Sequence, residues 1–229
     1  MLNSTDPSCE SAAISGFVLA GGRSSRLHRD KVLLPWNGAT LLDHAIDRLQ
    51  QVSSPVRVCA DRDDLGGFGL PILRDALPNA GPLGGIVAGL EQSQTPWNLF
   101  LAVDLPLLPV DLLRALAARA AAERAGALCI LPQVDGLPQP LCGLYHRSLR
   151  DGLHGALQHG TYKIMHAVRE ATAGIAGGRI DLFDVQSEAQ FDVQSGAQPD
   201  ASITSIRDWF LNINAPQDWQ RACELASAV

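Results

Sequence analysis

The chain alternates between short continuous runs of apolar residues and longer segments in which apolar residues recur at helical spacing. Continuous runs indicate buried strands, and they fall at residues 16–20, 56–60, 71–74, 98–103 and 127–131, with a further strand expected over 138–146. Helical spacing predicts helices over residues 40–51, 81–91 and 111–124, one or two more over 147–170, and a last helix that starts near Pro216. This rhythm indicates βαβ units. We therefore expect an α/β protein, a Rossmann-like three-layer sandwich whose mostly parallel central sheet carries helices on both faces.

Two segments depart from this rhythm. Residues 1–15 have neither a basic start nor an apolar run, so they are predicted to form a flexible tail rather than a signal peptide. Residues 183–198 hold two near-copies, FDVQSEAQ and FDVQSGAQ, a repeat far too short for a solenoid unit. We interpret it as a local duplication that lengthens a surface loop, mobile over residues 183–205 and without a catalytic role. Residues 16–229 are then expected to form one domain.

Composition narrows the classes of function. The formal net charge of −6 gives no reason to expect a broad nucleic-acid surface, and no window holds the roughly 18 apolar residues of a membrane span. The five cysteines are widely spaced and form no CxxC pair, which favours buried thiols in a reducing cytoplasm over disulfides or a zinc site. Only two of the 18 basic residues are lysines, Lys31 and Lys163.

The loop after the first predicted strand, residues 19–31, gives the clearest indication of a binding site. Its sequence LAGGRSSRLHRDK has two adjacent glycines and a local charge of +3 in a protein that is negative overall. Glycines let backbone N–H groups approach a ligand closely, so the loop is suited to bind a polyphosphate. The alternative is that it is only a solvated basic turn without a ligand. The loop matches neither a Walker sequence nor GxGxxG. Asp75 and Asp104 also follow predicted strands, and ligands of open parallel sheets bind beyond such strand ends.

The same loop resembles the signature of the molybdenum cofactor guanylyltransferases, which reads Leu-Ala-Gly-Gly, a spaced Ser, Arg-Met-Gly, and then Asp-Lys with a leucine step. The matching residues are Leu19, Ala20, Gly21, Gly22, Ser24, Arg26, Asp30, Lys31, Leu33, Leu34 and Pro35. Leu27 replaces the family's Met, and His28 replaces its Gly. Three more family motifs follow in order: Asp75 before a Gly-Pro-Leu-Gly-Gly turn in which Gly84 replaces Ala, Asp104 with Pro106, and Asn212 with Asn214.

The resemblance implies attack of the terminal phosphate of molybdopterin, with or without molybdenum, on the α-phosphorus of GTP. The products are the guanine dinucleotide cofactor and pyrophosphate. It implies Asp104 as the ligand of Mg²⁺, with Lys31 and Arg26 neutralising the triphosphate and the departing pyrophosphate. The nucleotide would also be held by the backbone of residues Leu19, Ala20, Gly21 and Gly22, and by Asp75 at the base or ribose. Asn212, Asn214 and Lys163 would contact the pterin.

Each of these residues also has a purely structural interpretation. Asp104 and Asp75 suit turns or helix caps, the two asparagines suit a helix start, and a lone lysine such as Lys163 is commonly just solvated. Cys59 lies where the family often has an Asn that helps to read the base.

Two other functions therefore remain open. One is a related nucleotidyltransferase that uses CTP or another acceptor phosphate, and the other is a binding protein for nucleotide or cofactor without turnover, which His28 would favour. The family also implies molybdoenzyme apo-proteins and other cofactor-synthesis proteins as partners, but neither nucleic acid nor a membrane.

Overall fold

The computed structural model describes residues 13–21, 30–62, 64–75, 77, 80–123, 125–187 and 205–227. Its main sheet has eight strands in the order β10-β7-β9-β6-β1-β4-β5, with β8 paired to β7. The strands are β1 (Ile14–Leu19), β4 (Val56–Cys59), β5 (Ile72–Leu73), β6 (Trp97–Ala102), β7 (Ala127–Val134), β8 (Leu137–Pro138), β9 (Cys142–His146) and β10 (Arg179–Asp184). A separate hairpin joins β2 (Pro35–Trp36) to β3 (Ala39–Thr40).

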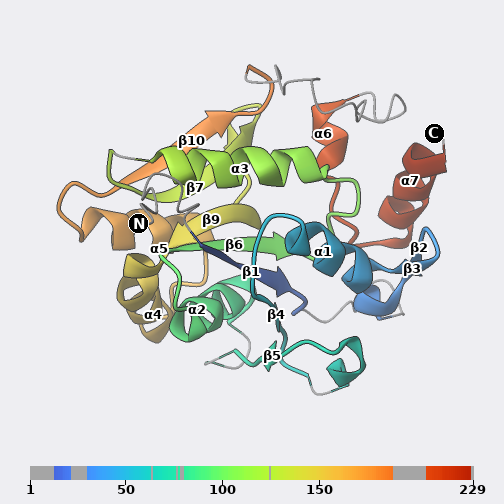
Figure 1. The fold of residues 1–229 in the computed structure, drawn as a ribbon, viewed down its shortest axis with the longest axis horizontal. Helices are drawn as coiled ribbons and strands as arrows, with labels where there is room; N and C mark the ends of the chain where they lie inside the picture. The colour runs from blue at the N-terminus through green and yellow to red at the C-terminus, as the bar shows by residue number, and fades with distance from the viewer. Residues whose placement is uncertain are drawn as a thin grey trace, which may run out of the picture.

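Strand direction confirms the predicted mostly parallel sheet. β1 runs parallel to β4 and β6, β4 to β5, and β10 to β7, whereas β9 runs antiparallel to both β6 and β7 (Figure 1). The carboxyl ends of β1, β4 and β6 therefore meet at one edge of the sheet, where ligands of such folds bind.

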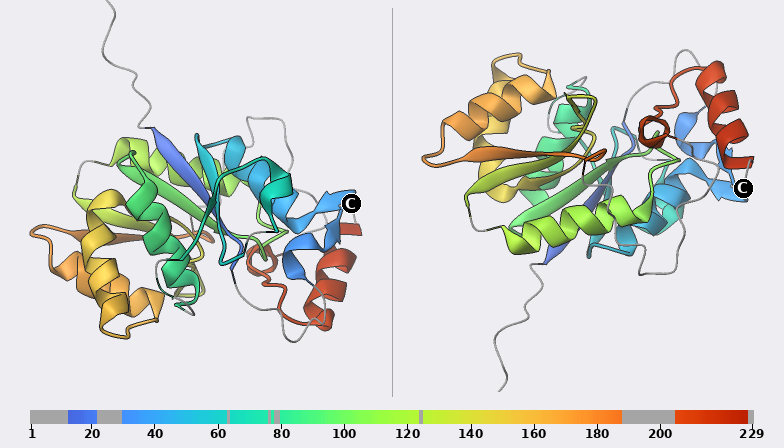
Figure 2. Two further views of the ribbon diagram at one scale, coloured as in Figure 1. Left: turned by 90° about the horizontal axis from the view of Figure 1, so that it is seen from below. Right: turned by 90° about the horizontal axis from the view of Figure 1, so that it is seen from above.

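Helices cover both faces of the sheet, as predicted (Figure 2). α1 (Leu41–Gln50) and α3 (Val110–Ala122) pack on one face, and α2 (Pro82–Gln92), α4 (Arg150–Gln158) and α5 (Ile164–Ala173) on the other. Two helices near the C-terminus, α6 (Ile206–Trp209) and α7 (Pro216–Ser227), lie beside the α1 face, and the short 3₁₀ helices are η1 (Lys31–Leu33), η2 (Gly66–Phe68) and η3 (Arg147–Leu149). None of the helices in the described ranges is long and apolar enough to cross a bilayer.

Alternation along the central strands fills both layers of the core. Val18 of β1 faces the α1 layer, and Phe17 faces the α2 layer, because successive side chains of a strand point to opposite faces. The rings of Phe17 and Phe100 stack with centroids 4.9 Å apart, and Tyr145 meets Phe100 edge to face. Gly89 of α2 fits against this pair, since a Cβ atom there would lie 2.7 Å from the ring of Phe100.

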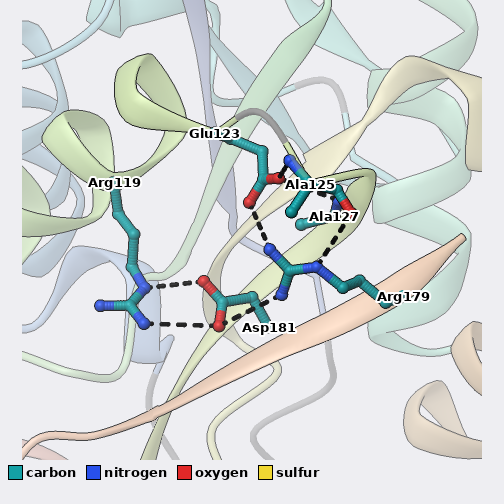
Figure 3. Close-up of polar contacts among 6 residues, drawn as sticks. All are labelled: Arg119, Glu123, Ala125, Ala127, Arg179 and Asp181. Atoms are coloured by element: carbon teal, nitrogen blue, oxygen red, sulfur yellow. Dashed lines mark hydrogen bonds and ion pairs between the residues drawn. The ribbon is translucent and has the colours of Figure 1, made fainter.

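Strand β10 at the edge of the sheet is fixed by ion pairs (Figure 3). Arg119 of α3 donates from Nε to Asp181 Oδ2 at 2.7 Å, and Arg179 donates from Nη2 to Glu123 Oε2 at 2.8 Å. The guanidinium of Arg119 also lies 5.2 Å from the ring centroid of Phe183. These contacts tie β10 to α3 and to the turn that follows it.

The structure corrects the expectations at both irregular segments. β1 begins at Ile14 and Ser15 is 1% exposed, so residues 14 and 15 belong to the sheet and not to the predicted tail. The predicted loop over 183–205 is wrong at its start, because Phe183 lies in β10 and Val185 is fully buried. Strand pairing with β7 buries this part of the first repeat copy. Residues 1–12 and 188–204 lie outside the described residues.

Most of the remaining predicted elements are confirmed with small changes in their bounds. The strand predicted over 138–146 is divided into β8 and β9, and residues 147–170 contain α4 and the first part of α5. The hairpin of β2 and β3 was not predicted, since each of its strands has only two residues.

Candidate functional site

A small cleft that opens to solvent lies at the carboxyl ends of β1, β4 and β6. Its lining includes Leu19, Gly21, Lys31, Asp75 and Asp104, which the sequence had nominated from three separate segments. It also includes Gly81, whose φ of 64° and ψ of −158° suit glycine and start α2. The parallel topology brings these segments together.

Lys31 and Asp104 form an ion pair at the cleft. Lys31 Nζ lies 2.7 Å from Asp104 Oδ2, and the two side chains are only 12% and 13% exposed. Lys31 stands at the start of η1, where the carboxylate of Asp30 accepts the N–H of Val32 at 3.3 Å. Asp104 lies two residues after the end of β6, in the turn before α3. The pair therefore joins the end of the basic loop to the end of the central strand.

Asn214 completes this cluster from the far end of the chain. Its Oδ1 accepts a hydrogen bond from Lys31 Nζ at 3.2 Å, and the backbone N–H of Ile213 donates to the carbonyl of Asp104 at 3.1 Å. The edge-to-face contact of Trp36 with Trp219, at 5.6 Å between centroids, packs the segment after Lys31 against α7. Packing of the hairpin on α7 thus places the asparagine segment beside the lysine.

The side chains of Asn212 and Asn214 make their hydrogen bonds to groups other than the start of α7. The carboxylate of Asp218 accepts the backbone N–H groups of Asn214 and Ala215 at 2.9 and 2.8 Å. This leaves the side chain of Asn214 for Lys31. Asn212 donates from Nδ2 to the carbonyl of Phe210 at 3.4 Å, while its Oδ1 is buried without a hydrogen-bond partner in the described part of the chain.

The free oxygen of Asp104 fits a cation. Asp104 Oδ1 is buried and makes no hydrogen bond with any described residue, a state that costs free energy unless another group satisfies the atom. No three His, Cys, Asp or Glu side chains gather as a metal site within the ranges the structure describes. A single carboxylate suits Mg²⁺, which retains waters and takes further oxygens from substrate phosphates. The residues present therefore fit Mg²⁺ bound together with a nucleotide.

Asp75 lies against the start of α2, at the other end of the cleft. A Cβ atom on Gly84 would come within 2.8 Å of Asp75 Oδ2, and one on Gly85 within 3.6 Å of Oδ1. Partial burial and the nearby charge of Asp61 raise the pKa of Asp75 to about 6. At neutral pH the carboxylate is still mostly ionised and can accept hydrogen bonds from a ligand.

Cys59 lines the same cleft between Asp75 and the end of β1. Burial raises the pKa of its thiol far above the usual range, so the group is a neutral thiol. Its backbone carbonyl accepts the N–H of Ala20 at 2.9 Å, which fixes the start of the glycine loop on β4.

The other nominated residues are less informative. Gly22 and Arg26 lie outside the described residues, as does His28. Lys163 is exposed, precedes α5 and does not line the cleft, and its ammonium makes no hydrogen bond or ion pair with any described residue. The structure therefore does not bring Lys163 to the Lys31 and Asp104 pair.

One residue at this site gave no signal in the sequence. Arg48 of α1 donates to the backbone carbonyls of Leu105 and Pro106, which follow Asp104. An arginine inside an amphipathic helix is indistinguishable from a solvated one until its tertiary neighbours are known.

A known protein family matches the part of this chain that contains the loop after β1, the neighbouring strand β6 and Asp104. A profile of the MobA-like NTP transferase domain matches residues 16–173. The chain belongs to this family. It is 41% identical over 162 residues to a molybdenum cofactor guanylyltransferase of Ralstonia nicotianae, which covers 66% of this chain and 79% of that protein. The enzyme of the same name from Yersinia pseudotuberculosis is 35% identical over 176 residues, or 74% and 88% of the two chains.

Solved structures share the MobA-like fold. Molybdopterin-guanine dinucleotide biosynthesis protein A of Archaeoglobus fulgidus superposes with a TM-score of 0.73 at 21% identity, over 94% of this chain and all of that one. The 2-C-methyl-D-erythritol 4-phosphate cytidylyltransferase of Thermus thermophilus gives 0.61 at 18% identity, over 93% and 98%. At such identities the likeness concerns the fold, and it confirms the predicted Rossmann-like class.

Proposed function

We propose that this MobA-like chain transfers GMP from GTP to the terminal phosphate of molybdopterin, with or without molybdenum, and releases pyrophosphate. The observation that carries the proposal is the Lys31 and Asp104 pair, which sets a cation and a buried free carboxylate oxygen side by side at the cleft. The similarity to the molybdenum cofactor guanylyltransferases of Ralstonia nicotianae and Yersinia pseudotuberculosis supports the identity of both substrates.

The chemistry requires neither a protein nucleophile nor a strong general base. A phosphate monoester has its second pKa near 6, so the acceptor is already mostly ionised at neutral pH. The difficulty is to bring two anions together in line, which requires neutralising charge and alignment. In this proposal Lys31 supplies positive charge to the triphosphate and to the departing pyrophosphate.

Asp104 would hold Mg²⁺ through the oxygen that lacks a partner. A bound Mg²⁺ supplies Lewis-acid stabilisation of the negative charge on the phosphate oxygens. Lys31 stays within reach of both the carboxylate and the phosphates. Because Asn214 contacts the same ammonium, it would fix the direction in which Lys31 points.

The remaining roles follow the shape of the cleft. The backbone at Leu19, Ala20 and Gly21 would line the phosphate side, and Asp75 would accept hydrogen bonds from guanine or ribose. The pterin, whose edge offers donors and acceptors, would meet the unpartnered Oδ1 of Asn212 and the side chain of Asn214. Arg26 and Gly22 remain predicted phosphate ligands, and Lys163 remains a predicted contact for the acceptor only.

We further propose that the protein works in the cytoplasm with cofactor-synthesis proteins, which supply its acceptor substrate, and with molybdoenzyme apo-proteins, which receive its product. The buried thiols of Cys59, Cys129 and Cys142 form no disulfide within the described ranges, which suits a reducing compartment.

A direct assay tests the reaction. The protein is incubated with Mg²⁺, molybdopterin and GTP labelled at the α-phosphate. The expected result is a labelled dinucleotide with an equal amount of pyrophosphate, which does not form with CTP or ATP. Failure to transfer label from any nucleotide would support the alternative of a binding protein without turnover.

A second candidate concerns the base alone. Cys59 occupies the cleft where the related enzymes often have an Asn, so one neutral hydrogen-bonding amide for the base is missing. Transfer from CTP at a rate equal to or above that from GTP would replace the guanylyl assignment by a cytidylyl one on the same fold.

A further inference from the structure

Arg48 of α1 lies against the turn that carries Asp104. Its Nη1 donates to the carbonyl of Leu105 at 3.4 Å, and its Nη2 donates to the carbonyl of Pro106. These are the two residues that directly follow Asp104, so the guanidinium is attached to the backbone that orients the carboxylate. Arg48 does not line the cleft.

The charge of Arg48 has no counterion among the described residues. No carboxylate there forms an ion pair with it, and burial lowers the pKa of the guanidinium to about 10, which still leaves it charged at neutral pH. Burying a cation without an anionic partner is costly. The interactions that offset this cost are the two carbonyl dipoles of the turn, because charged donors make the stronger hydrogen bonds.

Three consecutive carbonyls of this turn are held by residues outside it. The carbonyl of Asp104 accepts from Ile213 N at 3.1 Å, and those of Leu105 and Pro106 accept from Arg48. Two long backbone hydrogen bonds within the described residues also belong to this turn: Leu105 N–H donates to the carbonyl of Ala102, and Leu108 N–H donates to that of Leu105, both at 3.4 Å. Without Arg48 the backbone of residues 105 and 106 would lose its two hydrogen bonds from a charged donor, so the carboxylate of Asp104 would be held less firmly at the cleft.

We propose that Arg48 is a positioning residue for the divalent cation site at Asp104. It acts through the backbone of residues 105 and 106 and touches neither substrate nor metal. The inference rests on the proposed function in one respect, namely that Asp104 binds a divalent cation together with GTP.

Mn²⁺ binding in the presence of GTP, followed by electron paramagnetic resonance, provides a readout that does not depend on turnover. Arg48→Met should weaken Mn²⁺ binding about ten-fold or more, the range found when partners of metal ligands are removed. Arg48→Lys keeps the charge and one donor at a time, so it should give an intermediate affinity. Arg114→Met is the matched control, since Arg114 pairs with Asp111 on the exposed side of α3, and it should stay within about two-fold of the wild type.

Asp104→Asn serves as the benchmark that separates the two proposals. If the wild type and Asp104→Asn bind Mn²⁺ equally, the assignment of Asp104 fails and the role of Arg48 fails with it. If Asp104→Asn loses binding but Arg48→Met binds like the wild type, only the positioning role is overturned. A merely structural role would lower the melting temperature of Arg48→Met and leave its Mn²⁺ affinity unchanged. Should Arg48→Met not fold, Arg48→Lys decides, and an unchanged affinity in that variant overturns the proposal.

Discussion

Lys31 Nζ lies 2.7 Å from Asp104 Oδ2, although 73 residues separate the two along the chain. The pair brings the end of the basic loop to the end of β6, and both side chains are largely withdrawn from water. Such a pair is weak support for stability, because desolvation of the charges opposes their attraction. The pair lies at the cleft, beside a carboxylate oxygen that has no hydrogen-bond partner among the described residues, and a ligand shared by both groups explains this position better.

Replacement of Lys31 tests the cationic half of this pair. Lys31→Met should lower kcat by about 10²-fold or more, because a charge that stabilises the transferring phosphates is removed from a partly dry site. Lys163→Met is the matched control, since these are the only two lysines of the chain. It should leave GTP affinity unchanged, and any effect should be confined to the KM for molybdopterin. Full guanylyl transfer by Lys31→Met would contradict the assignment.

Replacement of Asp104 tests the metal-binding half. Asp104→Asn removes the charge with little change in shape, so GTP should raise the melting temperature of the wild type in a Mg²⁺-dependent manner and that of the variant much less. Asp111→Asn is the control, because Asp111 is on the exposed side of α3 and pairs only with Arg114 among the described residues. An identical Mg²⁺-dependent shift in wild type and Asp104→Asn would show that the metal binds elsewhere.

The pH dependence of GTP binding should report on Asp75. Its folded pKa of about 6 lies above the usual value, so the carboxylate gains a proton as the pH falls from 7 to 5. The neutral acid has lost acceptor capacity for guanine or ribose, and the KM for GTP should therefore rise over this range. Asp75→Asn should bind GTP weakly at pH 7 and lose this dependence. The same rise in KM below pH 6 in Asp75→Asn would assign the titration to another group.

Protonation of Asp75 should affect the stability of the protein and its affinity for GTP in opposite directions. A raised pKa means that the folded protein binds this proton more tightly than the unfolded chain, so the contribution of Asp75 to stability increases as the pH falls through about 6. At pH 7, Asp75→Asn should therefore melt at the same temperature as the wild type or higher, even as GTP affinity falls. Thermal unfolding without ligand measures this directly, and a marked loss of stability would indicate a structural role for the carboxylate.

The core makes an independent prediction at Gly89. A Cβ atom there would lie 2.7 Å from the ring of Phe100 and 3.0 Å from that of Phe17. Gly89→Ala should therefore cost about 1–3 kcal/mol through overpacking. Gly155→Ala in α4 meets no atom within 4 Å and should gain up to about 1 kcal/mol from helix propensity. Chemical denaturation of both variants checks the difference, and equal stabilities would contradict the packing described for α2.

The sequence predicted the layers of this fold because buried parallel strands and amphipathic helices have distinct apolar patterns. It missed β10, whose burial comes from pairing with β7 and from ion pairs with α3, neither of which is visible in a local pattern. Phe183 was assigned to a surface loop because it begins the first copy of the repeat. Pairing of a distant edge strand is a tertiary effect that outweighs local sequence features.

The sequence also predicted most, but not all, of the residues at the candidate site. Strand ends nominated Asp75 and Asp104, and the resemblance nominated Lys31 and Asn214. The structure brings Asp104, Lys31 and Asn214 into one cluster, and Asp75 lines the same cleft as Lys31 and Asp104. Arg48 could not be found in this way, because its partners are backbone carbonyls that carry no residue-specific signal. Lys163 was nominated from its place before an amphipathic segment, and it does not line the cleft.

A crystal structure with Mn²⁺ and a GTP analogue whose α,β-bridge cannot be cleaved is the most direct test of the central claim. The account predicts an anomalous Mn²⁺ peak bonded to the Asp104 carboxylate and to the triphosphate, with the ammonium of Lys31 hydrogen-bonded to the same triphosphate. A nucleotide bound in the cleft with its metal away from Asp104, or with phosphates that Lys31 does not reach, would contradict it.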